Sequence, residues 1–379
     1  MTRIGILNYA DVRNFGDVLF PLIVAHEVRT RIPMAEISYI TATGSTWAGM
    51  ESTRLDDTDL EGFDALLLGG GEIVHRFDDM LSDIYSRFGL TGIARPTDLV
   101  YSWTRADVPY KAWLGLGIPE PSAEVQGDIG YASATLHIAG VRGSQSHRRL
   151  LACGINDNLT RLTPDLGWFF PRLLAGRRPP KHPAEGYPYI AVQALGFTDP
   201  DPVAATLRRI ADASGLRIVL LPLTRCWHDA EPLRLLQAAG GEDFILVDDA
   251  MEDLDKLTIL GGATLYAGQS MHGFIGAMSQ NRPAGLITPY ADDKFNELLT
   301  DLDLHQFRCP GWDGLNALVS TLMWAPPVVF AQQRKKAERE LGALFDEVCT
   351  GILTQSQSLR PSLALMHEDD EEKKDSCPL

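Results

Sequence analysis

The feature that most constrains this chain is an alternation of short apolar runs with amphipathic stretches, which occurs twice along the sequence. In the first half, apolar runs typical of strands lie at residues 4–8, 36–40, 65–68, 111–116, 137–141 and 162–163. Residues 18–29 between the first two runs predict a helix. Strands that alternate with helices favour a parallel, doubly wound sheet, which binds ligands at the carboxyl ends of its strands.

The alternation stops at residues 174–188, which are rich in proline, glycine and basic side chains, and then restarts. Strands are predicted at residues 189–193, 216–222, 244–247, 263–267 and 283–287. Helices are predicted at residues 202–213, 233–239 and 251–261. The run at residues 328–353 is rich in strong helix formers and predicts one long closing helix.

We therefore expect an α/β protein of two domains that face a cleft, and a length of 379 residues suits two hydrophobic cores. The final segment is acidic and poor in large apolar residues, so we expect it to be disordered. The expected boundaries are 1–175 for the N-terminal domain, 176–188 for the linker, 189–325 for the C-terminal domain, 326–358 for the closing helix and 359–379 for the tail.

Composition excludes several kinds of function. A formal net charge of −16 argues against binding nucleic acid or anionic lipid through the overall field. The five cysteines are widely spaced and form no C-x-x-C pair, which is untypical of a disulfide framework or a zinc site and fits a reducing cytoplasm. No apolar run is long enough to cross a bilayer. We expect a cytoplasmic protein without a metal or an organic cofactor.

Two glycine-containing segments follow predicted strands. In the first, Gly16 permits a tight turn and Asp17 is expected to cap the next helix, and either this is a plain capping motif or Asn14 and Asp17 contact substrate. In the second, Gly69, Gly70 and Gly71 let a backbone approach a ligand closely or bind an anion, and Glu72 is a candidate base or hydrogen-bond partner. The second segment lacks both G-x-G-x-x-G and the Gly-Lys-Ser/Thr of a phosphate loop.

Two other polar side chains end predicted strands. Arg142 can clamp a carboxylate or phosphate with parallel hydrogen bonds, or it can form a structural salt bridge. Ser144 or Ser146 is expected to cap the helix that follows. Gln193 ends the first strand of the second domain and is a candidate substrate contact.

The segment from Ser270 to Gly273 predicts an anion site at a helix start. With Ser270 as N-cap, Met271, His272 and Gly273 form the first turn, where free N–H groups and the helix dipole favour a negative ligand. An anion there would favour protonated His272, so this histidine suits acid–base work. The alternative is a cleft histidine that only hydrogen-bonds a neighbouring loop.

Taken in order, these segments resemble the polysaccharide pyruvyl transferase family. The shared motifs are N-x-G-D-x-L at residues 14–19, G-G-G at 69–71, G-x-G-x-P at 115–119, a V-R-E-x-x-S-like run at 141–146, S-x-H-G at 270–273, and a late strand with Pro283 followed by Tyr290 and Lys294. Three positions depart from the family pattern. Many members carry arginine where Ser270 stands and glutamate where Gly143 stands, and the family's D-P is altered here to Pro164-Asp165-Leu166.

The resemblance implies a GT-B-like pair of Rossmann-like domains with the site in the cleft. It implies transfer of the enolpyruvyl unit of phosphoenolpyruvate onto sugar hydroxyls as a pyruvate ketal on a glycan. By this analogy His272 is the acid–base residue and Arg142 holds the donor's carboxylate or phosphate. Ser270 and the first-turn N–H groups complete the anion site, with Lys294 or Arg225 replacing the missing arginine charge.

Two other functions stay open at this point. One is a nucleotide-sugar glycosyltransferase of the same architecture, since a fold does not fix its chemistry. The other is a catalytically silent binding or partner protein that kept the cleft. The partners expected for the transferase are phosphoenolpyruvate and a sugar, glycan or lipid-linked saccharide, without nucleic acid, and a homo-oligomer is left open.

Overall fold

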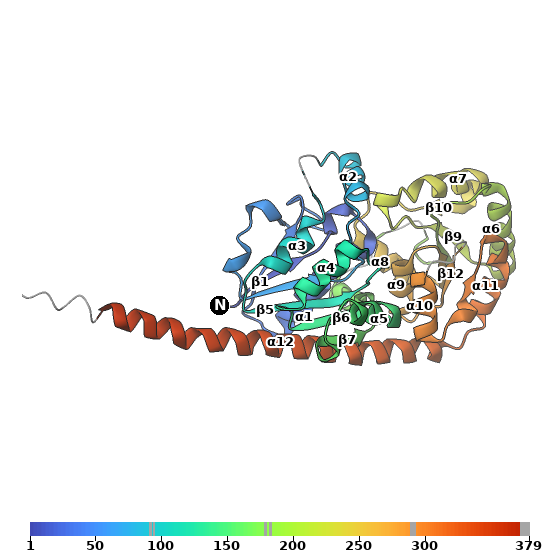
Figure 1. The fold of residues 1–379 in the computed structure, drawn as a ribbon. Coiled ribbons are helices and arrows are strands. Elements are labelled where there is room, and N and C mark those ends of the chain that lie inside the picture. The colour runs from blue at the N-terminus through green and yellow to red at the C-terminus, as the bar shows by residue number, and fades with distance from the viewer. Residues whose placement is uncertain (91–92, 94, 178–179, 182–183, 289–292, 372–379) are drawn as a thin grey trace, which may run out of the picture.

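A computed structural model describes residues 1–371 except 91–92, 94, 178–179, 182–183 and 289–292. Within these residues the chain forms two parallel β-sheets, each flanked by helices (Figure 1). We call the first sheet and its helices the N-lobe, and the second sheet and its helices the C-lobe. The expected α/β architecture of two doubly wound units is therefore confirmed, and parts of the expected linker at 176–188 lie outside the described residues.

The N-lobe sheet has the order β3-β2-β1-β4-β5-β6-β7, and every neighbouring pair is parallel. Its strands are β1 (Arg3–Leu7), β2 (Glu36–Thr41), β3 (Thr53–Arg54), β4 (Ala65–Gly69), β5 (Tyr110–Leu116), β6 (Ile138–Arg142) and β7 (Thr160–Thr163). Its helices are α1 (Phe15–Arg31), α2 (Asp78–Arg87), α3 (Asp98–Arg105), α4 (Ala123–Ala132), α5 (Ser144–Ala152) and the 3₁₀ helix η5 (Leu166–Leu174). The strand order reverses between β1 and β4, so this is the switch point where ligands bind in such sheets.

The C-lobe sheet has the order β10-β9-β8-β11-β12-β13 and is also parallel throughout. Its strands are β8 (Tyr189–Gln193), β9 (Arg217–Leu220), β10 (Phe244–Leu246), β11 (Leu265–Gly268), β12 (Ala284–Ile287) and β13 (Arg308–Cys309). Its helices are α6 (Pro200–Ser214), α7 (Ala230–Gly240), α8 (Asp253–Gly262), α9 (Met271–Met278), α10 (Asp293–Leu302) and α11 (Leu315–Met323). The corresponding switch point lies between β8 and β11.

The last helix, α12 (Pro327–Glu371), leaves the C-lobe and returns along the N-lobe (Figure 1). The long closing helix is confirmed, but it continues past residue 358 into the segment expected to be a tail. Its apolar residues Phe330, Leu341, Phe345 and Val348 are fully buried. Phe330 packs on Phe307 of the C-lobe and Phe345 packs on Phe169 of the N-lobe, so the C-terminal helix contributes to the core on both sides.

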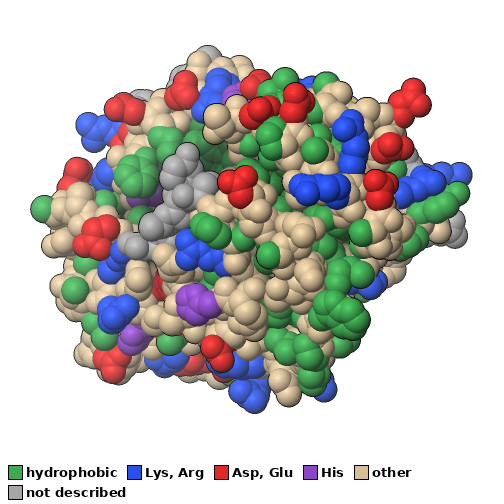
Figure 2. Space-filling model, turned by 90° about the vertical axis from the view of Figure 1, so that its right-hand side faces the viewer, with side chains coloured by type: hydrophobic (Ala, Val, Ile, Leu, Met, Phe, Trp, Pro, Cys, Tyr) green, Lys and Arg blue, Asp and Glu red, His purple; other side chains and the backbone are tan. Residues whose placement is uncertain are grey.

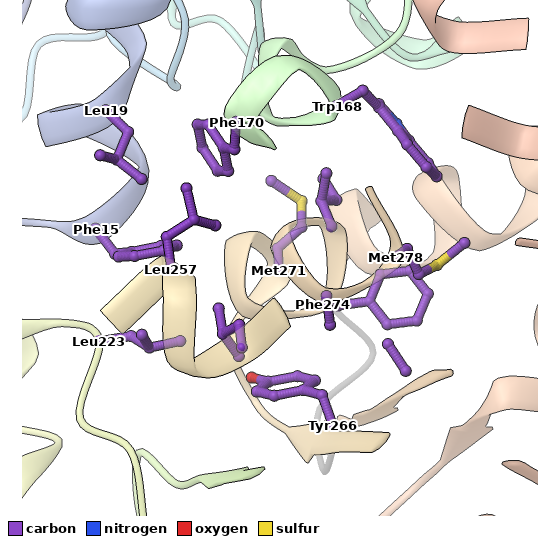
Figure 3. Close-up of a cluster of buried hydrophobic side chains, with 14 of the residues drawn as sticks. Phe15, Leu19, Trp168, Phe170, Leu223, Leu257, Tyr266, Met271, Phe274 and Met278 are labelled. Atoms are coloured by element: carbon purple, nitrogen blue, oxygen red, sulfur yellow. The ribbon is translucent and has the colours of Figure 1, made fainter. Parts of the chain in front are cut away.

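The two lobes share one cluster of buried apolar side chains around α9 (Figure 3). Figure 3 shows Phe15 of α1 and Phe170 of η5, both from the N-lobe, facing Leu257 of α8 and Met271 of α9. Every residue of α9 is buried. The small residues of this helix therefore allow close packing between the lobes, as at Gly276, which lies against Leu257 and Phe15.

An exposed apolar corner lies where α11 leads into α12. Trp324 is 86% exposed, and Met323 and Val328 are also exposed. Figure 2 shows the C-lobe face, on which hydrophobic side chains gather toward one edge among scattered charges. In the described part of the chain no single helix could cross a membrane by length and apolar content, although one bent pair, Trp312–Met323 with Pro327–Ser356, passes that test jointly.

Candidate active site

A cleft of about 1030 Å³ lies between the lobes, at the carboxyl ends of both sheets. Of the residues predicted to form the site, those that line the cleft are Asn14, Asp17, Gly71, Glu72, Arg142, Ser270, Met271, His272 and Lys294. They come from the loops after β1 and β4, the end of β6, and the starts of α9 and α10. The two switch points thus face each other, and the N-x-G-D and G-G-G turns meet the S-x-H-G turn across the cleft.

At the centre of the site, Arg142 from the N-lobe meets His272 from the C-lobe. The Arg142 Nη1 lies 3.1 Å from the His272 Nε2 and also donates a hydrogen bond to the Asp165 carboxylate. The His272 Nε2 lies 3.6 Å from the Asp165 Oδ2. Because a guanidinium can only donate, neutral His272 accepts from Arg142, whereas protonated His272 faces the carboxylate of Asp165. Both protonation states of the imidazole therefore have a partner.

Asp165, which no sequence motif marks as a site residue, joins Arg142 and His272 at the centre of the site. Burial alone would raise the pKa of Asp165, but the Arg142 guanidinium, His272 and the Gly167 amide outweigh it and hold the pKa well below its usual range. Burial would lower the pKa of Arg142, and the charges of Asp165 and Glu72 raise it instead. The pair is therefore ionised. Its sequence signal was weak, because Asp165 follows β7 as an isolated carboxylate in a loop.

The N-x-G-D turn joins the two lobes. Asn14 is the N-cap of α1, and its Oδ1 accepts a hydrogen bond from the Gly16 amide at 3.4 Å. The expectation that Asp17 caps this helix is wrong, because α1 starts at Phe15 and Asp17 lies inside its first turn. The Phe15 amide donates to the Leu223 carbonyl at 3.2 Å, and Asn14 forms an isolated β-bridge with a C-lobe residue, Thr224.

Gly16 makes room for the catalytic candidate His272. A Cβ atom at position 16 would lie 2.2 Å from the His272 Nδ1, so any side chain there would collide with the imidazole. The ring also packs edge-on against Phe20, with ring centroids 5.0 Å apart. The Nδ1 therefore faces the turn after β1, and the Nε2 is the ring nitrogen at Arg142.

The three-glycine run brings α1 close to β4 rather than offering a backbone cradle to a ligand. A Cβ at Gly69 would lie 2.7 Å from Val24, and a Cβ at Gly70 would lie 2.3 Å from Phe20. These two glycines, predicted as substrate contacts, do not line the cleft. Gly71, with a positive φ of 82°, does line the cleft.

Glu72 connects the cations of the two lobes. Its carboxylate lies 3.4 Å from the Lys294 Nζ and 3.9 Å from the Arg142 Nη2. Burial would raise the pKa of Glu72, but the charges of Lys294 and Arg142 outweigh it and lower the pKa. A Cβ at Gly117, the second glycine of the G-x-G-x-P run, would lie 2.7 Å from the Glu72 Cγ, so this glycine keeps the space that Glu72 occupies.

Gln193, predicted as a substrate contact, does not line the cleft. It is fully buried, donates to the Asp229 Oδ2 at 3.0 Å and accepts from the Gln269 amide at 3.0 Å. The side chain of Gln269, which lines the cleft, in turn accepts from the Leu195 amide at 2.7 Å. Gln193 thus positions Gln269, the residue that precedes Ser270. The sequence does not indicate this role, because a glutamine at a strand end looks the same whether it contacts a ligand or a neighbouring loop.

The S-x-H-G turn forms the helix start that was predicted. Ser270 is the N-cap of α9, and its Oγ accepts from the Gly273 amide at 3.1 Å. Gly273 does not line the cleft, contrary to its predicted role. A Cβ there would lie 2.5 Å from the Tyr266 hydroxyl, so Gly273 allows α9 to pack on β11. Tyr290, part of the late motif, lies outside the described residues.

The helix after Arg142 is capped from the other lobe. The N-cap position of α5 is Gly143, so neither Ser144 nor Ser146 caps it as expected. Instead the Glu297 carboxylate of α10 accepts from the amides of Gln145 and Ser146, the latter at 3.1 Å. A Cβ at Gly143 would lie 2.3 Å from this carboxylate, which excludes a side chain at that position.

A search of the described residues finds no group of three His, Cys, Asp or Glu side chains arranged to hold a metal ion. The polar groups of the cleft include two cations, Arg142 and Lys294, each within 4 Å of a carboxylate, and also His272 and Asp17. Such a set can bind an anion by exchanging it for a carboxylate, and it can transfer protons.

Comparison with solved structures identifies the architecture. The S. aureus MnaA–UDP co-structure shares 9% identity and a TM-score of 0.55, with 88% of this chain and 90% of that chain covered. The Methanocaldococcus jannaschii UDP-GlcNAc 2-epimerase, in complex with UDP-GlcNAc and UDP, shares 9% identity and a TM-score of 0.51, with 86% and 94% covered. The Rickettsia bellii UDP-N-acetylglucosamine 2-epimerase shares 12% identity and a TM-score of 0.50, with 92% of this chain and 98% of that chain covered. The fold is GT-B-like.

Comparison of the sequence with family models and curated proteins identifies the family. The search of curated proteins returns no significant match. The family model for polysaccharide pyruvyl transferase matches residues 14–289, which span most of both lobes and include the N-x-G-D turn, Arg142 and the S-x-H-G turn. This match covers more than half of the chain, and the chain belongs to the polysaccharide pyruvyl transferase family.

Proposed function

We propose that this transferase moves the pyruvyl group of phosphoenolpyruvate onto two hydroxyls of a sugar, forming a pyruvate ketal on a glycan or glycan precursor. Family membership supports the reaction class. The observation that carries the assignment of the site is the 3.1 Å contact between the Arg142 Nη1 and the His272 Nε2. These groups come from different lobes, and a ligand held by both would occupy the centre of the cleft.

The donor is an anion with a carboxylate and a phosphate, and the cleft offers it two cations. The contacts of Glu72 with Lys294 and Arg142, at 3.4 and 3.9 Å, are long for hydrogen bonds, so a donor oxygen can replace them at small cost. In our proposal Arg142 keeps its contact with Asp165 and turns its second nitrogen to the donor. The first-turn amides of α9 add partial positive charge at the same point.

Ser270 stands where many family members carry an arginine, and Lys294 is the residue we assign to the missing charge. Lys294 lines the cleft, whereas Arg225 does not. The Arg225 Nε instead donates to the Asp249 carbonyl at 2.8 Å, and its Nη2 to the Met251 carbonyl at 3.2 Å. The guanidinium of Arg225 therefore holds a C-lobe loop.

His272 is assigned as the acid that protonates C3 of the donor. The transferable proton would lie on the Nε2, because the Nδ1 faces the turn at Gly16. When the donor draws Arg142 toward itself, the Nε2 loses its competing contact. Protonation of C3 makes C2 electrophilic, and a sugar hydroxyl adds there before phosphate leaves.

The test is phosphate release from phosphoenolpyruvate with a panel of sugars and glycans, comparing wild type with His272→Ala. Loss of a positioned acid lowers turnover by about 100- to 10,000-fold. His26→Ala is the matched control, because His26 lies on α1 outside the cleft, and it should keep full turnover. Full turnover in His272→Ala would disprove the assigned role.

Thermal stabilisation by ligand distinguishes this function from nucleotide-sugar transfer. Phosphoenolpyruvate should raise the melting temperature of the wild-type protein in a concentration-dependent way. Lys294→Met should weaken this effect, because it removes a cation from the cleft. Stabilisation by nucleotide sugars without any by phosphoenolpyruvate would contradict the proposal.

A further inference from the structure

Asp17 is a carboxylate of the cleft whose position no structural role explains. It lies in the first turn of α1 and lines the cleft. Asp165 is bound to Arg142, and Glu72 lies beside Lys294. Within the described part of the chain, by contrast, the carboxylate of Asp17 has no hydrogen-bond or ion-pair partner.

The backbone makes space for this carboxylate. A Cβ at Gly71 would lie 2.5 Å from the Asp17 Oδ1, so the last glycine of the G-G-G run leaves that oxygen uncrowded. Asp17 is also next in sequence to Gly16, which accommodates the His272 ring. One turn therefore places the Asp17 carboxylate and the His272 imidazole at the same end of the cleft.

We infer that Asp17 is the general base that takes the proton from the attacking sugar hydroxyl, an inference that rests on the proposed function. The other two carboxylates are poorer bases. Asp165 accepts from a guanidinium and Glu72 lies against two cations. Of these three carboxylates, Asp17 alone has no hydrogen-bond or ion-pair partner within the described residues, and it lines the cleft.

The electrostatics agree with this role. Burial raises the pKa of Asp17 to about 6. Among the charged groups that face it, His272, Arg142 and Lys294 lower the pKa and Glu72 raises it. The carboxylate is thus ionised at neutral pH but close enough to its pKa to accept a proton readily, as a general base requires. In the same site the pKa values of Asp165 and Glu72 are lowered.

The two residues complete a balanced proton circuit. In the first step the hydroxyl oxygen bonds to C2 of phosphoenolpyruvate, its proton passes to Asp17, and the C2=C3 electron pair takes a proton from His272. The C2–O bond to phosphate then breaks, and Asp17 returns its proton to the leaving phosphate. The second hydroxyl bonds to C2 and gives its proton to His272. Both residues regain their starting states, and the products are the ketal and hydrogen phosphate.

The experiment compares wild type, Asp17→Asn and Asp201→Asn, using phosphoenolpyruvate and an acceptor from the panel that supports wild-type turnover. Asp17→Asn should lower kcat by about 100- to 10,000-fold while phosphoenolpyruvate still stabilises the protein in thermal melts. Asp201→Asn is the matched control, since Asp201 lies in the first turn of α6, is exposed and does not line the cleft. It should leave turnover unchanged.

The pH profile supplies a readout that does not depend on the folding of a variant. A base must be ionised, so the wild-type kcat/KM should fall as pH decreases through about 6. In Asp17→Asn this acid limb should vanish from the residual activity, and formate should restore part of the turnover of Asp17→Ala.

The possible failures are distinguishable. Wild-type phosphate release without an acid limb near pH 6, or Asp17→Asn with near wild-type kcat, would overturn the role of Asp17 alone. Loss of phosphoenolpyruvate binding in Asp17→Asn would make Asp17 a donor-binding residue and also overturn it. Absence of wild-type turnover with every acceptor would overturn the proposed function and this inference together.

Discussion

At the scale of single residues, Gly16 is required for the space that it leaves to a side chain of the other lobe, and not for the local structure of its helix. Its place in the first turn of α1 would suit alanine, which is the better helix former. The His272 Nδ1, however, lies 2.2 Å from where the alanine Cβ would be. The imidazole, contributed by the other lobe, thus decides the residue at position 16.

Gly16→Ala should therefore reduce turnover by about 100-fold, because displacement of a catalytic group by about 1 Å has that effect. The measurement is kcat together with the melting temperature. The matched control is Gly127→Ala in α4, where no atom lies within 4 Å of the added Cβ. That variant should keep its turnover and gain about 0.5–1 kcal/mol of stability. Equal turnover in the two variants would contradict the assigned position of His272.

At the scale of elements, α5 depends on α10 of the other lobe for its cap. Glu297 accepts from two amides at the start of α5, and the Asp301 Oδ2 accepts from the Ser144 amide at 3.0 Å. Arg142 lies immediately before this helix. The cap therefore fixes the position of the guanidinium, and the glycine at position 143 leaves room for the Glu297 carboxylate.

Glu297→Ala should lower the free energy of unfolding by about 1–2 kcal/mol, the usual cost of a lost N-cap. It should also raise KM for phosphoenolpyruvate, because Arg142 is less well fixed. Glu120→Ala is the control, since Glu120 also contacts α5, through Arg149, but is 82% exposed. Such surface pairs contribute little, so a change within about 0.5 kcal/mol is expected. Denaturant unfolding that gave equal values for both variants would show that the cap contributes nothing.

At the scale of the whole molecule, α12 packs on both lobes, and its Phe330 contacts Phe307 of the C-lobe with ring centroids 5.3 Å apart. Phe345 of α12 is fully buried and packs on Phe169 of η5, with ring centroids 6.1 Å apart. The guanidinium of Arg31, at the end of α1, lies 5.7 Å from the ring of Phe345. The C-terminal segment is therefore part of the N-lobe core, and the lobes should unfold together.

Phe345→Ala should lower the free energy of unfolding by about 3–5 kcal/mol, because it leaves a cavity in a packed core. Leu353→Ala tests the same helix at a position that is 38% exposed, and it should cost far less. As Phe345→Ala is unfolded, near-ultraviolet dichroism and turnover should be lost in the same single transition. If an early transition in near-ultraviolet dichroism left turnover intact, the packing of α12 would not be needed for the active structure.

The sequence could predict what depends on neighbouring residues. The strand at Tyr189–Gln193 was predicted to the residue because it is a continuous apolar run, and the cap at Ser270 was predicted because a serine before a helix bonds an amide three residues later. The start of α1 was missed, since its first turn, Phe15-Gly16-Asp17, looks like a loop. Motif order then led to the family, which the match over residues 14–289 shows.

Only the tertiary structure decided which of these groups meet. Glu297 caps amides 151 and 152 positions away in the chain, and Arg142 meets a histidine 130 positions away. No local pattern encodes such pairs. The energy of a buried charge depends on how much hydration it loses and on which charged or hydrogen-bonding partner compensates for that loss, and the partner comes from a distant part of the chain. For the same reason the glycines at 69, 70 and 273 proved to serve packing. The sequence by itself determined the elements, their order and the candidate chemistry, whereas the contact between lobes determined which side chains form the site.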